Sequence, residues 1–73
     1  MATQNVESEV TGNVWKIEVK EGDVVEEEDV IMILESMKME IPVEAPCAGK
    51  VSKILVSEKD PVKEDQVVAV IET

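Results

Sequence analysis

The chain contains an internal repeat, and this feature limits its fold more than any other. When the sequence is compared with itself at an offset of 37, residues 12–35 align with residues 49–72 without a gap. A unit this short cannot bury its apolar face alone, so we expect the two copies to pack on each other. Eleven of the 24 aligned pairs are identical: Gly12/Gly49, Val14/Val51, Lys16/Lys53, Ile17/Ile54, Val19/Val56, Glu21/Glu58, Asp23/Asp60, Val25/Val62, Glu27/Glu64, Val30/Val67 and Glu35/Glu72.

Each copy has the residue pattern of short β-strands. Trp15, Ile17 and Val19 alternate with charged residues, which is the periodicity of a strand with one buried face. Turn-forming residues follow at 21–23 and 58–61, and each copy ends in an aliphatic run. No stretch sustains the spacing of a helix. We therefore predict strands at about 5–10, 13–19, 24–26, 30–36, 39–45, 49–55, 61–63 and 67–72.

Two such units related by an approximate two-fold axis predict one all-β domain over residues 1–73. Its two small sheets should face each other as a compact sandwich or flattened barrel. The link between the copies, residues 36–40, should then emerge at one end of the domain and the chain termini at the opposite end.

The composition excludes several classes of function. The chain has no histidine, which excludes imidazole bases, Ser-His or Cys-His catalysis and histidine metal sites. No nucleophile has a neighbouring base and no glycine loop could cradle a phosphate, so we do not expect an independent enzyme.

The net charge and the cysteine content indicate which partners and which cellular compartment to expect. Seventeen acidic residues stand against seven lysines, for a net charge of -10, which disfavours nucleic acid and anionic membranes as partners. The single cysteine cannot form an internal disulfide, and the chain begins with no apolar leader. We expect a soluble cytoplasmic protein.

The segment Glu35-Ser36-Met37-Lys38-Met39-Glu40 joins the two copies and is the candidate site. If this segment is extended, Met37 and Met39 share one side and Lys38 points to the other. Lys38 is either an ordinary exposed hairpin lysine or an amine presented for use. The two methionines either fill the core at the sheet end or serve as a contact surface. Glu35 and Glu40 are either exposed strand ends or part of a surface that a modifying enzyme reads.

Three further features have alternative interpretations. The acidic turn at residues 26–29 could bind a cation, but it lacks the spaced oxygens and central glycine of a calcium loop, so a solvated turn is the preferred interpretation. Cys47 is interpreted as a small core or surface thiol rather than a reactive one. Trp15 should be partly buried against the sheet end, with a partner contact as the alternative.

The sequence resembles the biotinyl/lipoyl attachment domain family, and in particular its biotin carboxyl carrier members. The resemblance lies in Glu-Ser-Met-Lys-Met at residues 35–39, in the repeat itself, in Glu21-Gly22-Asp23, and in Pro42-Val43-x-Ala45-Pro46. Biotin carriers have Glu-Ala-Met-Lys-Met at this place, whereas lipoyl members usually have a triplet of the Asp-Lys-Ala type. The short chain looks most like the small stand-alone attachment proteins of the family.

This resemblance implies a flattened β-barrel of two four-stranded antiparallel sheets, the barrel-sandwich hybrid. It implies that a biotin protein ligase joins biotin to Lys38 as an amide, with Met37 and Met39 concerned in recognition and transfer. The biotin would carry a carboxyl group from a biotin carboxylase site to a carboxyltransferase site, and the chain would be a non-catalytic carrier subunit. A lipoyl or dual biotin/lipoyl acceptor is the first alternative, and an unmodified β-sandwich adaptor is the second.

The chain departs from the family pattern in several turns. Glu28, Lys59 and Asp65 stand where glycine is common, so these turns should be strained or differently shaped.

Overall fold

The computed structural model describes residues 2–73, in which every regular element is a β-strand. No segment among residues 2–73 forms a helix long and apolar enough to cross a membrane. All eight predicted strands are present, with shifts at their ends. They are β1 (Thr3–Glu7), β2 (Gly12–Ile17), β3 (Val24–Val25), β4 (Val30–Ser36), β5 (Met39–Glu44), β6 (Gly49–Ile54), β7 (Pro61–Val62) and β8 (Val67–Glu72).

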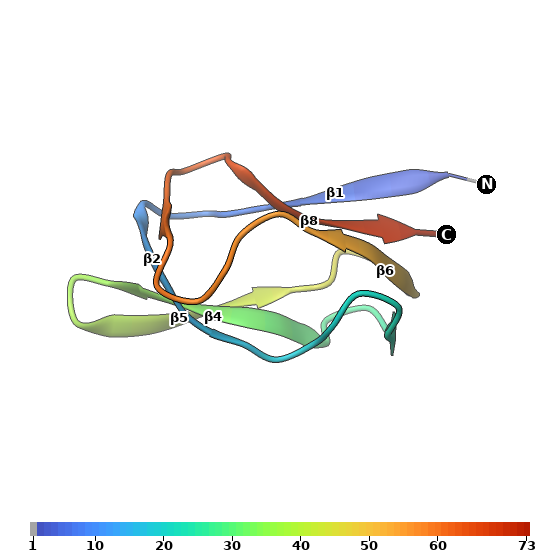
Figure 1. Cartoon of the computed structure of the whole chain (residues 1–73), viewed down its shortest axis with the longest axis horizontal. Helices are drawn as coiled ribbons and strands as arrows, with labels where there is room; N and C mark the ends of the chain where they lie inside the picture. Colours follow the sequence, from blue (N-terminus) through green and yellow to red (C-terminus); the bar gives the residue numbers. More distant parts are fainter. Residues whose placement is uncertain (1) are drawn as a thin grey trace.

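The strands form two four-stranded antiparallel sheets, which confirms the predicted fold class. The strand order is β1-β8-β6-β3 in one sheet and β5-β4-β2-β7 in the other. Figure 1 shows them as two layers, with β1, β8 and β6 above β2, β4 and β5. Each sheet contains strands from both copies of the repeat, because β3 pairs with β6 and β7 pairs with β2. The copies are therefore interlocked rather than simply stacked.

Hydrogen bonds between the two halves recur at the interval of the repeat. Glu21 Oε2 accepts from the Ile54 N–H at 2.9 Å, and Glu58 Oε2 accepts from the Ile17 N–H at 3.2 Å. The same exchange occurs in the backbone, where the N–H of Val14 donates to the Asp60 carbonyl and that of Val51 to the Asp23 carbonyl, both at 2.8 Å. These reciprocal bonds extend the ladder across the two copies beyond the short strands.

The core is aliphatic and lies between the two sheets. It is built mainly by the long apolar runs of β4 and β8, which occupy the second position from the edge in their sheets. Ile31, Met32 and Leu34 of β4 are fully buried, as are Val68, Ala69 and Ile71 of β8. Burial of the Ile, Met, Leu and Val side chains contributes about 1.5–3 kcal/mol each, so these two strands supply much of the stabilisation.

The first strand differs most from its prediction, because β1 ends at Glu7 instead of continuing to residue 10. Ser8 is buried, and its hydroxyl donates to the Val10 carbonyl at 2.6 Å and accepts from the Val10 N–H at 3.3 Å. A serine that bonds two residues ahead bends the chain into a turn. The alternation of Val6, Ser8 and Val10 therefore continues past the end of the strand.

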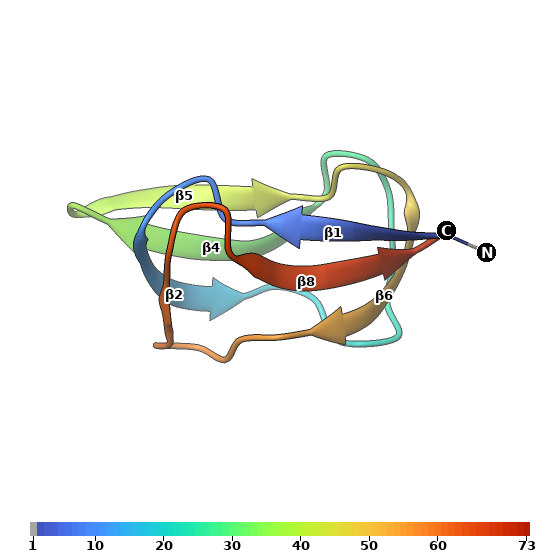
Figure 2. The same ribbon diagram turned by 90° about the horizontal axis from the view of Figure 1, so that it is seen from above.

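The molecule is elongated, and the link between the two copies lies at the end opposite the chain termini, as the repeat predicts. The principal extents are 37 × 18 × 18 Å. The β4–β5 hairpin protrudes at one end, and the N and C termini lie together at the other (Figures 1 and 2). The termini are held by the N–H of Thr73, which donates to the Ala2 carbonyl at 2.8 Å. The hairpin is thus as far from the chain ends as the fold allows.

The turns that lack glycine are in the left-handed region, and this yields a stability prediction. Lys59 has φ of 77°, and Gly22, its equivalent in the first copy, has φ of 98°. Left-handed backbone costs a non-glycine residue about 1–2 kcal/mol, and glycine recovers part of this after its own entropy loss. We expect Lys59→Gly to raise the free energy of unfolding by about 0.5–1 kcal/mol in urea denaturation.

Gly22→Ala is the matched control for this prediction. A Cβ at Gly22 would meet no atom within 4 Å, so only the backbone conformation opposes it. We expect Gly22→Ala to lower stability by about 1 kcal/mol. A loss of stability in Lys59→Gly would contradict the assignment of strain to this turn. Glu28 and Asp65, which are equivalent positions of the repeat, also have positive φ, of 74° and 68°.

Candidate functional site

The lysine lies in the two-residue loop of the β4–β5 hairpin. Ser36 and Met39 are the last paired residues of the two strands, and Met37 and Lys38 form the loop with φ of 53° and 66°. Two consecutive positive φ values are typical of a type I′ turn. The expectation that residues 37–39 alternate as an extended chain is therefore wrong. Met37 and Lys38 are the two central turn residues, whereas Met39 belongs to β5.

The sequence of the loop does not favour its conformation. Type I′ turns prefer Asn-Gly, and each residue with a side chain costs about 1–2 kcal/mol in the left-handed region. The strands impose the turn, because Leu34 pairs with Ile41 and Glu35 with Glu40 below it. Strained backbone persists only where its surroundings determine it, and it is frequent at functional sites.

The side chains of the hairpin tip are exposed. Met37 is 92% exposed and Met39 is 61% exposed, so the interpretation that they fill the core is wrong. Lys38 is exposed as well, and it takes part in no ion pair among residues 2–73. The arrangement presents a primary amine between two flexible apolar side chains. Exposed methionines at a tip suit a contact surface, because the thioether chain adapts to its partner.

Glu35 and Glu40 lie directly opposite each other at the base of this tip, and both are exposed. Like charges at opposed strand positions are destabilising by up to about 1 kcal/mol. The pair places negative charge next to Lys38 on the hairpin. An enzyme that approaches the lysine would encounter both carboxylates.

Trp15 lies near the hairpin on the neighbouring strand and is 49% exposed. The register of β2 against β4 shifts between Val14 and Lys16, which leaves Trp15 in a β-bulge. Trp15 lines an open hollow together with Asn13, Val14, Glu35 and Lys59. Glu35, which pairs with Asn13 and lines this hollow, stands three positions before Lys38 in the chain.

The other candidate features have structural explanations. In the acidic turn, Asp29 Oδ2 accepts from the Glu26 N–H at 2.9 Å, which closes the turn. Within residues 2–73, no group of three or more acidic or cysteine side chains could hold a metal ion. Cys47 is a partly buried free thiol that packs against the core.

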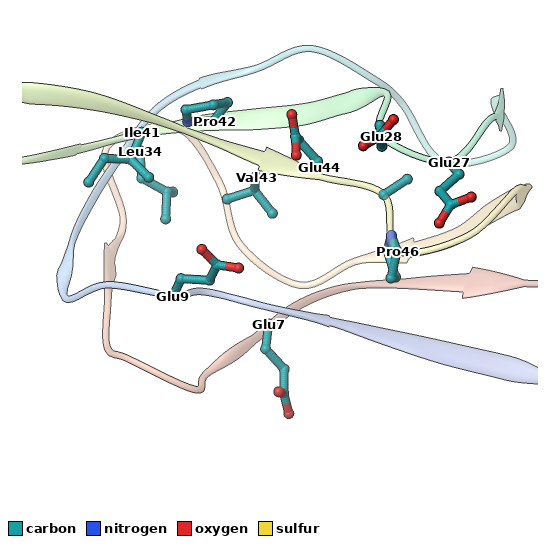
Figure 3. Close-up of a pocket in the computed structure, with 11 residues that line it drawn as sticks. Glu7, Glu9, Glu27, Glu28, Leu34, Ile41, Pro42, Val43, Glu44 and Pro46 are labelled. Atoms are coloured by element: carbon teal, nitrogen blue, oxygen red, sulfur yellow. The ribbon is translucent and has the colours of Figure 1, made fainter.

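A groove of about 310 Å³ lies between β1 and β5, the edge strands of the two sheets. Figure 3 shows Glu9 reaching toward Val43 across it, whereas Glu7 and Glu44 point away from each other. Pro42 lies on the β5 side of the groove. Proline on an edge strand limits pairing with another chain. Lys38 does not line this groove, so the groove is separate from the candidate site.

The structure adds two contacts that the sequence does not indicate. Ser36 Oγ donates to the Thr11 carbonyl at 2.9 Å. Gly12 packs so closely on the end of β4 that a Cβ there would collide with the Glu35 carbonyl oxygen and lie 3.1 Å from Ser36 Cβ. For the close approach at Gly12, the sequence offers one indication, which is that both copies of the repeat begin with glycine.

Comparisons with known proteins show which family and which chains this one is similar to. The model of the family described as "Biotin-requiring enzyme" matches residues 2–71. The chain is 52% identical over 40 residues to the biotin/lipoyl attachment protein of Bacillus subtilis, a segment that covers 55% of each chain. It is 48% identical over 42 residues to the biotinylated protein TB7.3 of Mycobacterium tuberculosis, covering 58% of this chain and 59% of that protein. These aligned segments thus span little more than half of either relative.

A solved structure extends the likeness to almost the whole fold. The crystal structure of the Kluyveromyces lactis urea carboxylase superposes with a TM-score of 0.93 and 42% identity, covering 99% of this chain and 6% of that enzyme. The family match spans nearly all of the chain, and the structural match covers 99% of it. The chain therefore belongs to the biotinyl/lipoyl attachment domain family.

Proposed function

We propose that the chain is a biotin carboxyl carrier and that Lys38 is the residue to which biotin is attached. The observation that supports this most is the placement of Lys38. It is an exposed amine in the imposed turn of the β4–β5 hairpin, and this hairpin lies at the pole opposite the chain termini in a domain of this family. The six other lysines lack this combination of a two-residue hairpin loop and flanking methionines.

The exposed lysine suits attachment of a carboxylic acid as an amide. The C–N bond forms between the activated carboxyl carbon and Lys38 Nζ, while the activating group leaves and the amine gives up a proton. Amide formation removes the positive charge, and the lysine stem becomes the proximal part of a flexible tether. When bound, biotin accepts a carboxyl group at one site and releases it at another.

The position of the tether explains why a small rigid domain is useful. Attachment converts encounters of the free cofactor with each site into local encounters at high effective concentration. The hairpin is distant from the termini, so a connection through the termini leaves the tip free to enter an active site. Met37 and Met39 supply an adaptable apolar surface beside the amide.

The proposed partners are a biotin protein ligase, a biotin carboxylase and a carboxyltransferase. A urea carboxylase and a biotin/lipoyl attachment protein among the similar proteins support this set. In this proposal the chain is a non-catalytic subunit that acts in the cytoplasm, where its free cysteine needs no disulfide partner.

The hollow beside Trp15 provides a spectroscopic prediction. Because the hollow begins three residues from Lys38, we propose that the attached ring can fold back onto the exposed indole. Trp15 is the sole aromatic residue, so its fluorescence reports this contact without interference. We expect biotinylation to change the emission intensity and to reduce quenching by acrylamide. Identical quenching before and after modification would contradict the contact.

Incubation with biotin, ATP and a biotin ligase, followed by intact-mass measurement, tests the proposed function. We expect one biotinyl group per chain, located on Lys38 by peptide mapping. A parallel incubation with lipoate and a lipoyl ligase tests the alternative, because one relative is named for both groups. The absence of any biotin mass gain, or a gain on another lysine, would refute the proposal.

A further inference from the structure

We infer that Thr11, immediately before β2, and Gly12, the first residue of β2, act as positioning residues that hold the lysine turn in shape for modification. The inference rests on the proposed function of Lys38. The two residues contact the end of β4 immediately before the turn, through the carbonyl of Thr11 and the missing side chain of Gly12.

The turn residues contribute little to holding their own conformation. Met37 and Lys38 both have positive φ and exposed side chains, so packing of these side chains does not offset the strain. The conformation must therefore be imposed where the strands enter the loop. On the β4 side, this place is Glu35 and Ser36.

Two contacts restrain those residues from the neighbouring strand. Ser36 Oγ donates to the Thr11 carbonyl at 2.9 Å, and Gly12 allows the backbone of β2 to approach the Glu35 carbonyl. Thr11 is itself restrained, because its Oγ1 accepts from the Glu64 N–H at 3.2 Å. The end of β4 is thereby tied, through β2, to the turn before β8.

The repeat supplies a matched control at the other pole. Gly49 is the equivalent of Gly12, and a Cβ there would lie 2.6 Å from the Glu72 carbonyl oxygen. Gly12→Ala and Gly49→Ala would therefore both place a Cβ against the carbonyl of the equivalent glutamate, and Gly49→Ala would also press on the buried side chain of Ile71, whose Cγ2 lies 2.6 Å from the new Cβ. Glu72 precedes the chain end instead of the lysine turn, so only Gly12→Ala should disturb Lys38.

The experiment compares the two variants as full chains at a temperature where both are folded by circular dichroism. We expect the unfolding midpoint to fall in both variants. We expect kcat/KM for biotinylation by the ligase to fall about fivefold or more in Gly12→Ala, corresponding to about one hydrogen bond of lost preorganisation, and to remain within about twofold of wild type in Gly49→Ala. Amide exchange should accelerate at residues 36–39 in Gly12→Ala only.

Ser36→Ala and Ser36→Thr test the same inference if Gly12→Ala does not fold. Loss of the hydroxyl should accelerate amide exchange at residues 36–39 by about two- to tenfold, and Ser36→Thr should restore protection. Equal modification kinetics in the two glycine variants, or unchanged exchange in Ser36→Ala, would overturn the positioning role. Failure of the wild-type chain to accept biotin would instead overturn the proposed function.

Discussion

Lys38→Arg is expected to abolish biotinylation completely while leaving the fold unchanged. Arginine has similar length and the same charge, and residue 38 is exposed in a loop, so no packing is lost. The guanidinium stays protonated in proteins and offers no free amine to attack an activated carboxyl group. Intact mass after incubation with biotin, ATP and ligase should show no added biotin.

The control for this experiment is Lys53→Arg, at an exposed position of β6 remote from the hairpin tip. It makes the same chemical change and should accept biotin as the wild type does. Circular dichroism should show the same thermal transition for both variants. Biotin on any residue of Lys38→Arg would mean that position 38 is not the acceptor.

Leu34→Ala and Ile71→Ala should be the most destabilising of the substitutions considered. The two residues are equivalent in the repeat, and both are fully buried between the sheets. A buried Leu or Ile reduced to Ala typically costs about 2–5 kcal/mol. A chain of this size is stable by roughly 5–10 kcal/mol. Each variant should therefore lose a large share of its stability and melt at least about 10 °C lower.

Urea denaturation with an unchanged m value would show that this loss is a change in stability. Leu55→Ala is the matched control, because Leu55 is half-exposed and its truncation should cost less than about 1 kcal/mol. Equal losses at positions 34 and 71 are expected if the two halves of the core are packed alike. A loss below about 1 kcal/mol at either position would contradict its burial.

The strands could be predicted because their signal is local. Alternating residues in β2 and the aliphatic runs of β4 and β8 indicate strands with one or two buried faces, whatever they pair with. The repeat also predicted the positions of the two poles, because equivalent halves place the link and the termini at opposite ends. Strand ends were less predictable, as the Ser8 hydroxyl shows at the end of β1.

Pairing between the halves could not be predicted from local patterns. The two-residue strands β3 and β7 carry no information on whether they join their own half or the other one. In the structure, each crosses to the opposite half. The cross-bonds of Glu21 and Glu58 belong to the same arrangement, and each joins residues more than 30 positions apart.

Some features of the candidate site could likewise be predicted from the sequence, and others could not. The sequence indicates the location of the site at the junction of the repeat. It also indicates the residue types around Lys38 and the family resemblance. The left-handed conformation of Met37 and Lys38 was not, because neither residue favours a positive φ. That conformation comes from the register of β4 and β5 and from the approach of β2 at Gly12.

The order of residues alone therefore determined the elements, their duplication and the one lysine placed at the junction, since these depend on side-chain periodicity and on composition. Only the tertiary structure decided how the halves interlock, where the methionines lie and how the lysine is presented. Those features depend on contacts between residues distant in the chain, which enforce a turn that local preferences oppose.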